Sequence, residues 1–326
     1  MGNWHCKCLL AVVLVLTAYP VMAMTKSLSA QSNPLLKDWR TPFGVPPFEQ
    51  IKADHFLPAF REAIARHKQE IAAIAANPEA PTFDNTVLAL EASGRLLTKV
   101  DDVFGNLVRA ETNDRLQAIN REVAPMRSAH LDDMVFDERL FERIRALWDR
   151  RDELALDPEQ DMLLERTWKR FVRGGARLDG ASKTRLRDIN AALAALGLQF
   201  TDNVLQEMNR YRLVVERRDD LAGLPDQAVT AAAETAEQAG MKAKWVFTLH
   251  HPSLWPFLKN AGNRELRRKI FTAYTTRGNH DNATDNKATL APIAALRAEK
   301  ARLLGYGTWA DYVLEEHMAK TPASVY

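Results

Sequence analysis

Apolar residues recur every three or four positions through most of this sequence. That spacing places apolar side chains on one face of an α-helix, so it predicts a succession of amphipathic helices. In the first of them, residues 54–77, the apolar stripe consists of Phe60, Ile64, Ile71 and Ile74. Further helices are expected at 82–112 (capped by Asp84 or Asn85), 115–133, 137–151, 158–173, 182–208, 263–276, 286–304 and 309–319.

Two short β-prone runs interrupt the helical pattern, LVV at 213–215 and WVFTL at 245–249. They predict a two-stranded ribbon, because Val, Trp and Phe favour the half-buried surface of a strand. Strands and helices do not alternate along the chain, as a parallel sheet would require. The expected fold class is therefore mainly α, with a small β ribbon.

The N-terminal residues predict a secretory signal peptide. An apolar run, Leu9–Leu16, follows Lys7, and the small residue Ala23 suits the last position before a cleavage site. We therefore expect residues 1–23 to be removed on export, leaving a periplasmic chain without stable membrane insertion. The run is shorter than the ~20 residues that span a bilayer. An uncleaved segment that anchors the chain to the membrane is the alternative.

Both cysteines, Cys6 and Cys8, precede the apolar run. The mature chain would therefore contain no thiol, which excludes disulfides, cysteine-bound zinc and cysteine catalysis. Lys and Arg number 44, Asp and Glu number 42, and the two signs are interspersed along the chain. This balance predicts that nucleic acid is not a partner.

Glu315, Glu316 and His317 form a candidate metal cluster near the end of the sequence. A helical zinc protease site uses His-Glu-x-x-His, in which two imidazoles share one helix face and the Glu activates water. The positions four residues away from His317 hold Val313 and Thr321 instead. These three polar residues are therefore interpreted as structural or solvated.

The adjacent pair His250–His251 would point to opposite sides of a strand, although a loop before Pro252 leaves a metal role open. Adjacent acids do not face one another on a helix, so three pairs are expected at solvated faces or caps: Asp101–Asp102, Asp132–Asp133 and Asp219–Asp220. From composition and spacing we accordingly assign no catalytic, cofactor-binding or metal-binding residue.

Glycines and cap residues predict where several helices end and begin. Gly174–Gly175 and Gly305 are expected at helix C-termini. Side-chain caps are expected at the N-termini of three C-terminal helices: Thr284 or Asp285, Thr308 with Asp311, and Thr321 before Pro322.

Several long stretches resemble one family. They are PPFEQIKADHFLPAFREAI (46–64), NPEAPTFDNTVLALEASGRLL (77–97), RFVRGGARLDGASKTRLRDIN (170–190), KWVFTLHHPSLWPFL (244–258), RELRRKIFTAYTTRG (264–278) and DNKATLAPIAALRAEKARLLGYGTWADYVLEEHMAKTP (285–322). From about residue 33 to residue 322, the chain resembles the thimet oligopeptidase-like zinc metallopeptidases, in particular the branch of peptidyl-dipeptidase Dcp and oligopeptidase A.

The resemblance implies a mostly α-helical fold, in which an N-terminal domain forms one wall of a deep channel opposite a catalytic domain. Short peptides would enter this channel. It also implies zinc held by the two histidines of His-Glu-x-x-His and a downstream Glu, with the motif Glu as general base. That motif does not occur in this sequence. No position here therefore inherits a catalytic, cofactor or metal role, and the chain alone is expected to bind no zinc specifically and to be inactive.

The resemblance also predicts the domain organisation. We expect a Pro-rich lead-in at 24–50, an N-terminal helical domain at 51–255, and the first helices of a truncated catalytic domain at 256–326. The chain would then be the N-terminal part of an exported zinc-dependent peptidyl-dipeptidase or oligopeptidase that acts on short peptides as a monomer. The alternative is a self-contained, non-catalytic helical protein that binds peptides or a protein partner.

Overall fold

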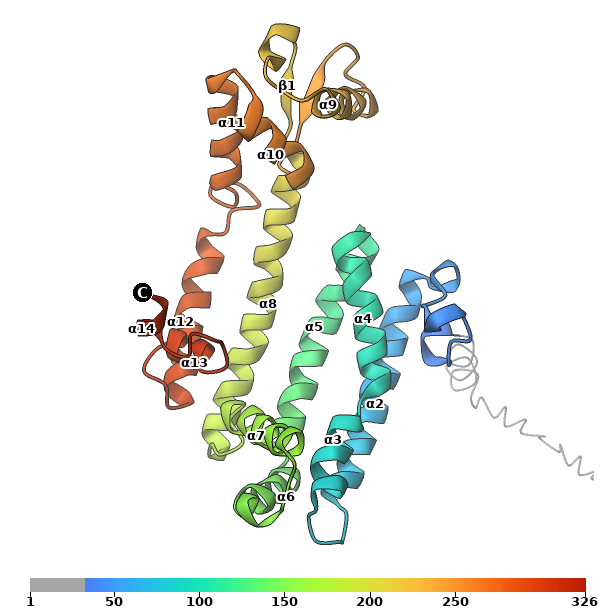
Figure 1. Cartoon of the computed structure of the whole chain (residues 1–326), viewed down its shortest axis with the longest axis vertical. Coiled ribbons are helices and arrows are strands. Elements are labelled where there is room, and N and C mark those ends of the chain that lie inside the picture. Colours follow the sequence, from blue (N-terminus) through green and yellow to red (C-terminus); the bar gives the residue numbers. More distant parts are fainter. Residues whose placement is uncertain (1–32) are drawn as a thin grey trace, which may run out of the picture. The chain divides into compact units, whose positions relative to one another are not determined.

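The structure, a computed structural model, describes residues 33–326 (Figure 1). The predicted signal peptide, with Cys6 and Cys8, lies outside the described residues. The helices are α2 (Phe56–Ala75), α3 (Ala89–Ala92), α4 (Arg95–Ala110), α5 (Asp114–Val135), α6 (Glu138–Trp148), α7 (Pro158–Arg173), α8 (Gly180–Arg210), α9 (Asp226–Gln238), α10 (His251–Asn260), α11 (Arg264–Thr275), α12 (Lys287–Leu303), α13 (Trp309–Leu314) and α14 (Pro322–Val325). The strands are β1 (Leu213–Val215) and β2 (Trp245–Phe247).

This arrangement confirms the mainly α fold with a small β ribbon. β1 and β2 pair antiparallel, with Leu213 opposite Phe247 and Val215 opposite Trp245. The long helix α8 runs alongside α12 (Figure 1). Helices predicted near 115–133, 158–173, 182–208 and 286–304 are present as α5, α7, α8 and α12.

The described chain separates into two compact units. The first comprises residues 33–67 and 94–116, and the second comprises 68–93 and 117–326. The domain limits predicted from the sequence, 51–255 and 256–326, remain predictions.

The first unit packs around three buried phenylalanines. The ring of Phe104 on α4 lies 5.0 Å from the ring of Phe56 and 5.3 Å from that of Phe60, both on α2. The beginning of the described chain is tied to the residue before α2, because Asn33 Nδ2 donates to the carbonyl of His55 at 2.8 Å. This hydrogen bond attaches the Pro-rich lead-in to the first unit.

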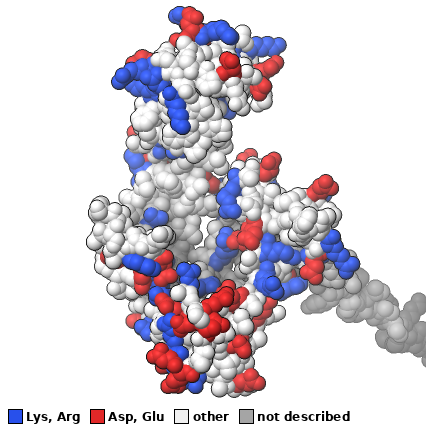
Figure 2. Space-filling model, in the orientation of Figure 1, with Lys and Arg blue, Asp and Glu red and all other residues white. Residues whose placement is uncertain are grey.

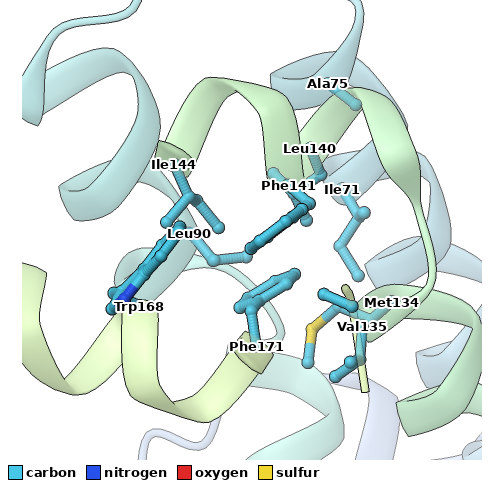
Figure 3. Close-up of a cluster of buried hydrophobic side chains, with 11 residues drawn as sticks. Ile71, Ala75, Leu90, Met134, Val135, Leu140, Phe141, Ile144, Trp168 and Phe171 are labelled. Carbon is cyan, nitrogen blue, oxygen red and sulfur yellow. The ribbon is translucent and has the colours of Figure 1, made fainter. Parts of the chain in front are cut away.

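The second unit has a core where α6 and α7 meet, with contributions from the end of α2, α3 and α5 (Figure 3). The rings of Phe141 and Trp168 stack with centroids 5.3 Å apart, and Phe171 is fully buried beside them. Full burial of a large apolar side chain contributes about 1.5–3 kcal/mol. This core fixes α5 and α7, whose polar faces contribute to the candidate site.

A further core of the second unit joins β1 and β2 to α9, α10 and α11. The rings of Phe247 on β2 and Phe257 on α10 lie 4.5 Å apart, and Ile270 on α11 is fully buried. A two-stranded ribbon is barely stable alone in water. Packing against these helices therefore stabilises it.

The helix predicted over 82–112 is wrong as a single element. The structure has a π-helical turn at Phe83–Leu88, then α3 and α4, with a break at Gly94. Gly94 has a φ angle of 69°, and a Cβ atom there would lie 2.8 Å from the ring of His67. Only glycine fits this backbone conformation and this close approach, so the helix cannot continue through it.

The predicted helix C-termini at glycines are confirmed. α7 ends at Gly174, and Gly175 follows with a φ angle of 98°. The Ala176 N–H donates to the Phe171 carbonyl at 3.0 Å, as in a Schellman motif. Gly305, with a φ angle of 86°, lies just beyond the end of α12 in the same left-handed region.

The predicted N-caps at Thr308 and Thr321 are confirmed. The N-cap prediction at Asp84 or Asn85 is wrong, because the structure has Thr82 there. At α12 the N-cap position is Asn286, whose side chain makes no cap hydrogen bond, and the predicted Asp285 instead accepts from the Lys287 N–H, the first of the helix, at 2.8 Å. Asn286 is held by tertiary contacts, because its Nδ2 donates to the Phe200 carbonyl at 3.1 Å and its Oδ1 accepts from Asn203 at 2.9 Å. These partners cannot be identified from the residues that neighbour Asn286 in the sequence.

Two helices, α9 and α10, have no counterpart among the predictions. α9 buries only Ala232 and Ala236, and such small residues make a weak apolar stripe. Pro252 made α10 difficult to predict from the sequence. It lies in the first turn of the helix, where its missing N–H costs no helical hydrogen bond. The helix predicted at 309–319 is shorter than expected and ends at Leu314.

Acidic and basic side chains are interspersed over the face shown in Figure 2, as the sequence indicates. Some form exposed ion pairs, such as Arg185 on α8 with Glu299 on α12 at 2.6 Å. Exposed pairs of this kind each contribute at most about 1 kcal/mol. Among residues 33–326, no helix is both long and apolar enough to cross a membrane.

Candidate functional site

The zinc ion implied by the family resemblance finds no binding site in the described residues. Within 33–326, no three His, Cys, Asp or Glu side chains lie together in a way that could hold a metal ion. A protein zinc site needs at least three such ligands. The donor set therefore does not fit zinc, and no chemical step can be assigned to a metal here.

The adjacent histidines take separate partners at the beginning of α10. His250 Nε2 lies 3.1 Å from Asn209 Oδ1, and its Nδ1 lies 3.2 Å from Thr248 Oγ1. His251 Nε2 instead lies 3.3 Å from the Tyr274 hydroxyl. The two rings therefore position α10 against neighbouring elements and do not converge on one point.

A polar pocket of about 270 Å³ lies among α5, α7, α8, α12 and α13 in the second unit. We call it the Lys300 pocket. Its lining consists of Leu131, Asp132, Val135, Arg170, Arg173, Gly174, Asn190, Lys300 and Tyr312. Two hydrogen bonds connect three of these side chains. Lys300 Nζ donates to Asn190 Oδ1 at 2.6 Å, and Asn190 Nδ2 donates to Asp132 Oδ1 at 2.7 Å.

Burial shifts the pKa values at both ends of this hydrogen-bonded chain. It raises the pKa of Asp132, against the opposing effects of the Asn190 hydrogen bond and the charges of Arg187 and Lys300. It lowers the pKa of Lys300, against the opposing charge of Asp132. Both shifts disfavour the charged forms. The attraction between the opposite charges of Asp132 and Lys300 therefore offsets only part of the cost of burying them.

A second cluster, at one side of the Lys300 pocket, joins the end of α7 to α13. Arg173 Nη2 donates to the Tyr312 carbonyl at 2.7 Å, and Arg173 Nη1 forms an ion pair with Glu315. The Tyr306 hydroxyl donates to the same Glu315 carboxylate at 2.5 Å. Burial, followed by this hydrogen bond, raises the pKa of Tyr306 to about 12. Glu315 therefore has a structural role, one of the two alternatives expected from the sequence, and His317 is exposed.

A separate cavity of about 340 Å³ lies beside the end of α8. Its acidic member, Glu207, already accepts a hydrogen bond from the Gly278 backbone N–H, and His280 Nε2 lies 3.7 Å from the same carboxylate. Glu207 therefore positions the loop between α11 and α12.

Sequence reasoning missed most of the Lys300 pocket. It placed Asp132 at a solvated face or cap, but Asp132 is only 5% exposed, so that prediction is wrong. Its neighbour Asp133 forms exposed ion pairs with Lys68 and Arg187, so the two acids have different environments. Asn190 and Lys300 carried no local signal, because they are 110 residues apart in sequence.

Comparisons with known proteins place the chain in a family. The sequence model of Peptidase family M3 matches residues 257–326. The dipeptidyl carboxypeptidase of Escherichia coli (strain K12) is 38% identical over 290 residues, which make up 89% of this chain and 43% of that protein. The chain belongs to the thimet oligopeptidase-like peptidase family. This result confirms the resemblance to the peptidyl-dipeptidase and oligopeptidase A branch.

Other members of this family are similar over the same region. The dipeptidyl carboxypeptidase of Salmonella typhimurium is 36% identical over 89% of this chain and 43% of that protein. The oligopeptidase A of Haemophilus influenzae is 29% identical over 91% of this chain and 43% of that protein. The chain thus spans less than half the length of these curated relatives.

Proposed function

We propose that this chain forms the N-terminal, peptide-handling part of a zinc-dependent peptidyl-dipeptidase or oligopeptidase acting on short peptides. The observation that carries the proposal is the 38% identity to the Escherichia coli dipeptidyl carboxypeptidase over 89% of the chain. An oligopeptidase A is also similar over 91% of the chain, so the proposal includes both the peptidyl-dipeptidase and the oligopeptidase activity. The family match at 257–326 supports a peptidase domain that begins near residue 256, after a helical domain at 51–255.

In this proposal the catalytic groups come from residues other than 1–326. The sequence contains no His-Glu-x-x-His, and residues 33–326 contain no cluster of three metal-binding side chains. What these residues supply is the helical surface that receives and orients the peptide. Binding and orientation contribute to catalysis only when reactive groups are present as well.

A chimera tests the proposal. Residues 33–322 of this chain would replace the matched 43% of the Escherichia coli relative. We expect the chimera to bind one zinc ion and to release dipeptides from a quenched-fluorescent peptide with a free C-terminus. The full chain of 326 residues should bind no stoichiometric zinc and show no chelator-sensitive turnover. Zinc would be measured by mass spectrometry of the purified proteins.

The unmodified Escherichia coli protein is the positive control, and a C-terminally amidated peptide separates the two activities. Cleavage of the free peptide alone indicates dipeptide removal, whereas internal cleavage of both peptides indicates an oligopeptidase. A folded, zinc-loaded chimera without activity would contradict the proposal. So would chelator-sensitive turnover by the chain of 326 residues.

We further propose that residues 1–23 direct export to the periplasm. The apolar run after Lys7 and the small residue at Ala23 support this. When the full chain is expressed in a Gram-negative bacterium, its periplasmic form should begin at Met24 by intact mass. Replacing Val13 and Leu14 by Arg should abolish export, because two charges disrupt the apolar run. A cytoplasmic wild-type chain that retains residues 1–23 would refute this proposal.

A further inference from the structure

The charges that line the Lys300 pocket are out of balance. The lining includes three cationic residues, Arg170, Arg173 and Lys300, but only one acid, Asp132. Arg173 is neutralised by its ion pair with Glu315. Asp132 compensates Lys300, to which it is joined through Asn190, whereas the acid that acts on Arg170 is Glu91, which is not part of the lining.

Arg170 is the least compensated of these cations. Among the residues that the structure describes, no carboxylate lies within ion-pair distance of its guanidinium, whose only hydrogen-bond partner is Met134 Sδ at 3.9 Å. Arg170 is an exposed residue, yet burial of part of its side chain lowers its pKa against the charge of Glu91. A guanidinium without a carboxylate partner can donate two N–H groups side by side to the oxygen atoms of a ligand.

The size of the pocket limits what it can hold. At about 270 Å³ it is smaller than typical sites for drug-sized ligands. A phosphate ion or a single carboxylate group, with few atoms attached, fits this space. A planar Arg fork and a Lys ammonium are the side chains that proteins use to bind such oxygens.

We propose that the Lys300 pocket binds a small oxyanion, either a carboxylate or a phosphate, between Arg170 and Lys300. The anion supplies negative charge beside Arg170, which forms no ion pair with a carboxylate among the described residues. Arg173 lies at the edge of the site, where Glu315 reduces its attraction for the ligand. This binding does not depend on the proposed peptidase function, because it uses only residues present in the described chain.

Isothermal titration calorimetry of the full chain at low ionic strength tests the proposal with inorganic phosphate and with the dipeptide Ala-Ala as free acid. We expect saturable binding of at least one. Arg170→Gln should weaken that binding by about ten-fold, because a charge-assisted pair of hydrogen bonds is lost. Glu315→Gln should tighten it about three-fold, because Arg173 is no longer neutralised. A destabilised protein would not produce such a gain.

Arg268→Gln is the matched control. Arg268 is exposed on α11 and pairs with Glu265 at 2.6 Å, away from the pocket, so affinity should stay within about two-fold. Binding of phosphate alone assigns the pocket to phosphates. Binding of Ala-Ala but not its C-terminal amide assigns it to carboxylates. Absence of saturable binding by both probes, or equal losses in the Arg170 and Arg268 variants, would overturn the proposal.

Discussion

Replacing Arg143 by Met is expected to lower the free energy of unfolding by about 3 kcal/mol. Arg143 lies on α6, is 8% exposed, and donates hydrogen bonds to four neutral oxygens. Two of these are the backbone carbonyls of Asn77 and Glu79, at 2.8 and 3.0 Å. The others are the side-chain oxygens of Asn85 and Thr86, at 2.9 and 3.3 Å. Met would fill the space of the aliphatic stem but donate to none of them.

Arg145→Met provides the control on the same helix. Arg145 is exposed, and within residues 33–326 it pairs only with Glu142, one turn away. Its loss should cost no more than about 0.5 kcal/mol. Urea unfolding would measure both variants, and Arg143→Met should also lower the melting temperature by roughly 6 to 12 °C. Equal stability of the two variants would show that Arg143 does not hold the segment before α3 in place.

Replacing Gly223 by Ala is expected to destabilise the second unit by a similar amount, about 3 kcal/mol. Gly223 has a φ angle of 86°, a conformation that Ala adopts only at a cost. In addition, its Cβ atom would lie 2.4 Å from the Asn260 carbonyl oxygen. The two turns are held together by a 2.6 Å hydrogen bond from the Gly262 N–H to the Ala222 carbonyl. Neither backbone can move away without weakening that bond.

Gly240→Ala separates the two contributions. Gly240 has a comparable φ angle of 73°, but nothing lies within 4 Å of a Cβ atom there. Its replacement should therefore cost only the conformational term, about 1 kcal/mol. The free energies of unfolding of both variants would be compared in urea titrations. If Gly240→Ala proved as damaging as Gly223→Ala, the close approach to Asn260 would not matter.

Local sequence signals were sufficient for most of the helices and for the ribbon. The apolar stripe of 54–77 became α2 because its period matches one helix face. The cap at Thr308 and the glycine at Gly305 act through hydrogen bonds and backbone angles within a few residues. The apolar pattern of the Ala-rich α9 was weak, and no helix was predicted there. A helix that buries only small side chains depends on its neighbours for stability.

The candidate site could not be predicted in the same way. Asn190 is 58 residues from Asp132 and 110 from Lys300, and no periodic pattern links positions so far apart. Arg173 and Glu315 are separated by 142 residues. At Gly94, the ring that leaves no room for a side chain is that of His67, which α2 brings beside it.

By itself, the sequence determined the helical class, the ribbon, many helix ends, the absence of His-Glu-x-x-His and the resemblance to a peptidase family. These follow from interactions between residues close in the chain, or from stretches that can be read directly. The tertiary structure alone decided that Asp132 is buried, that Glu315 belongs to an ion-paired cluster and that Arg170 lines a pocket without a carboxylate partner among the described residues. Charge, burial and hydrogen bonding depend on which helices pack together, and packing joins residues that the sequence keeps far apart.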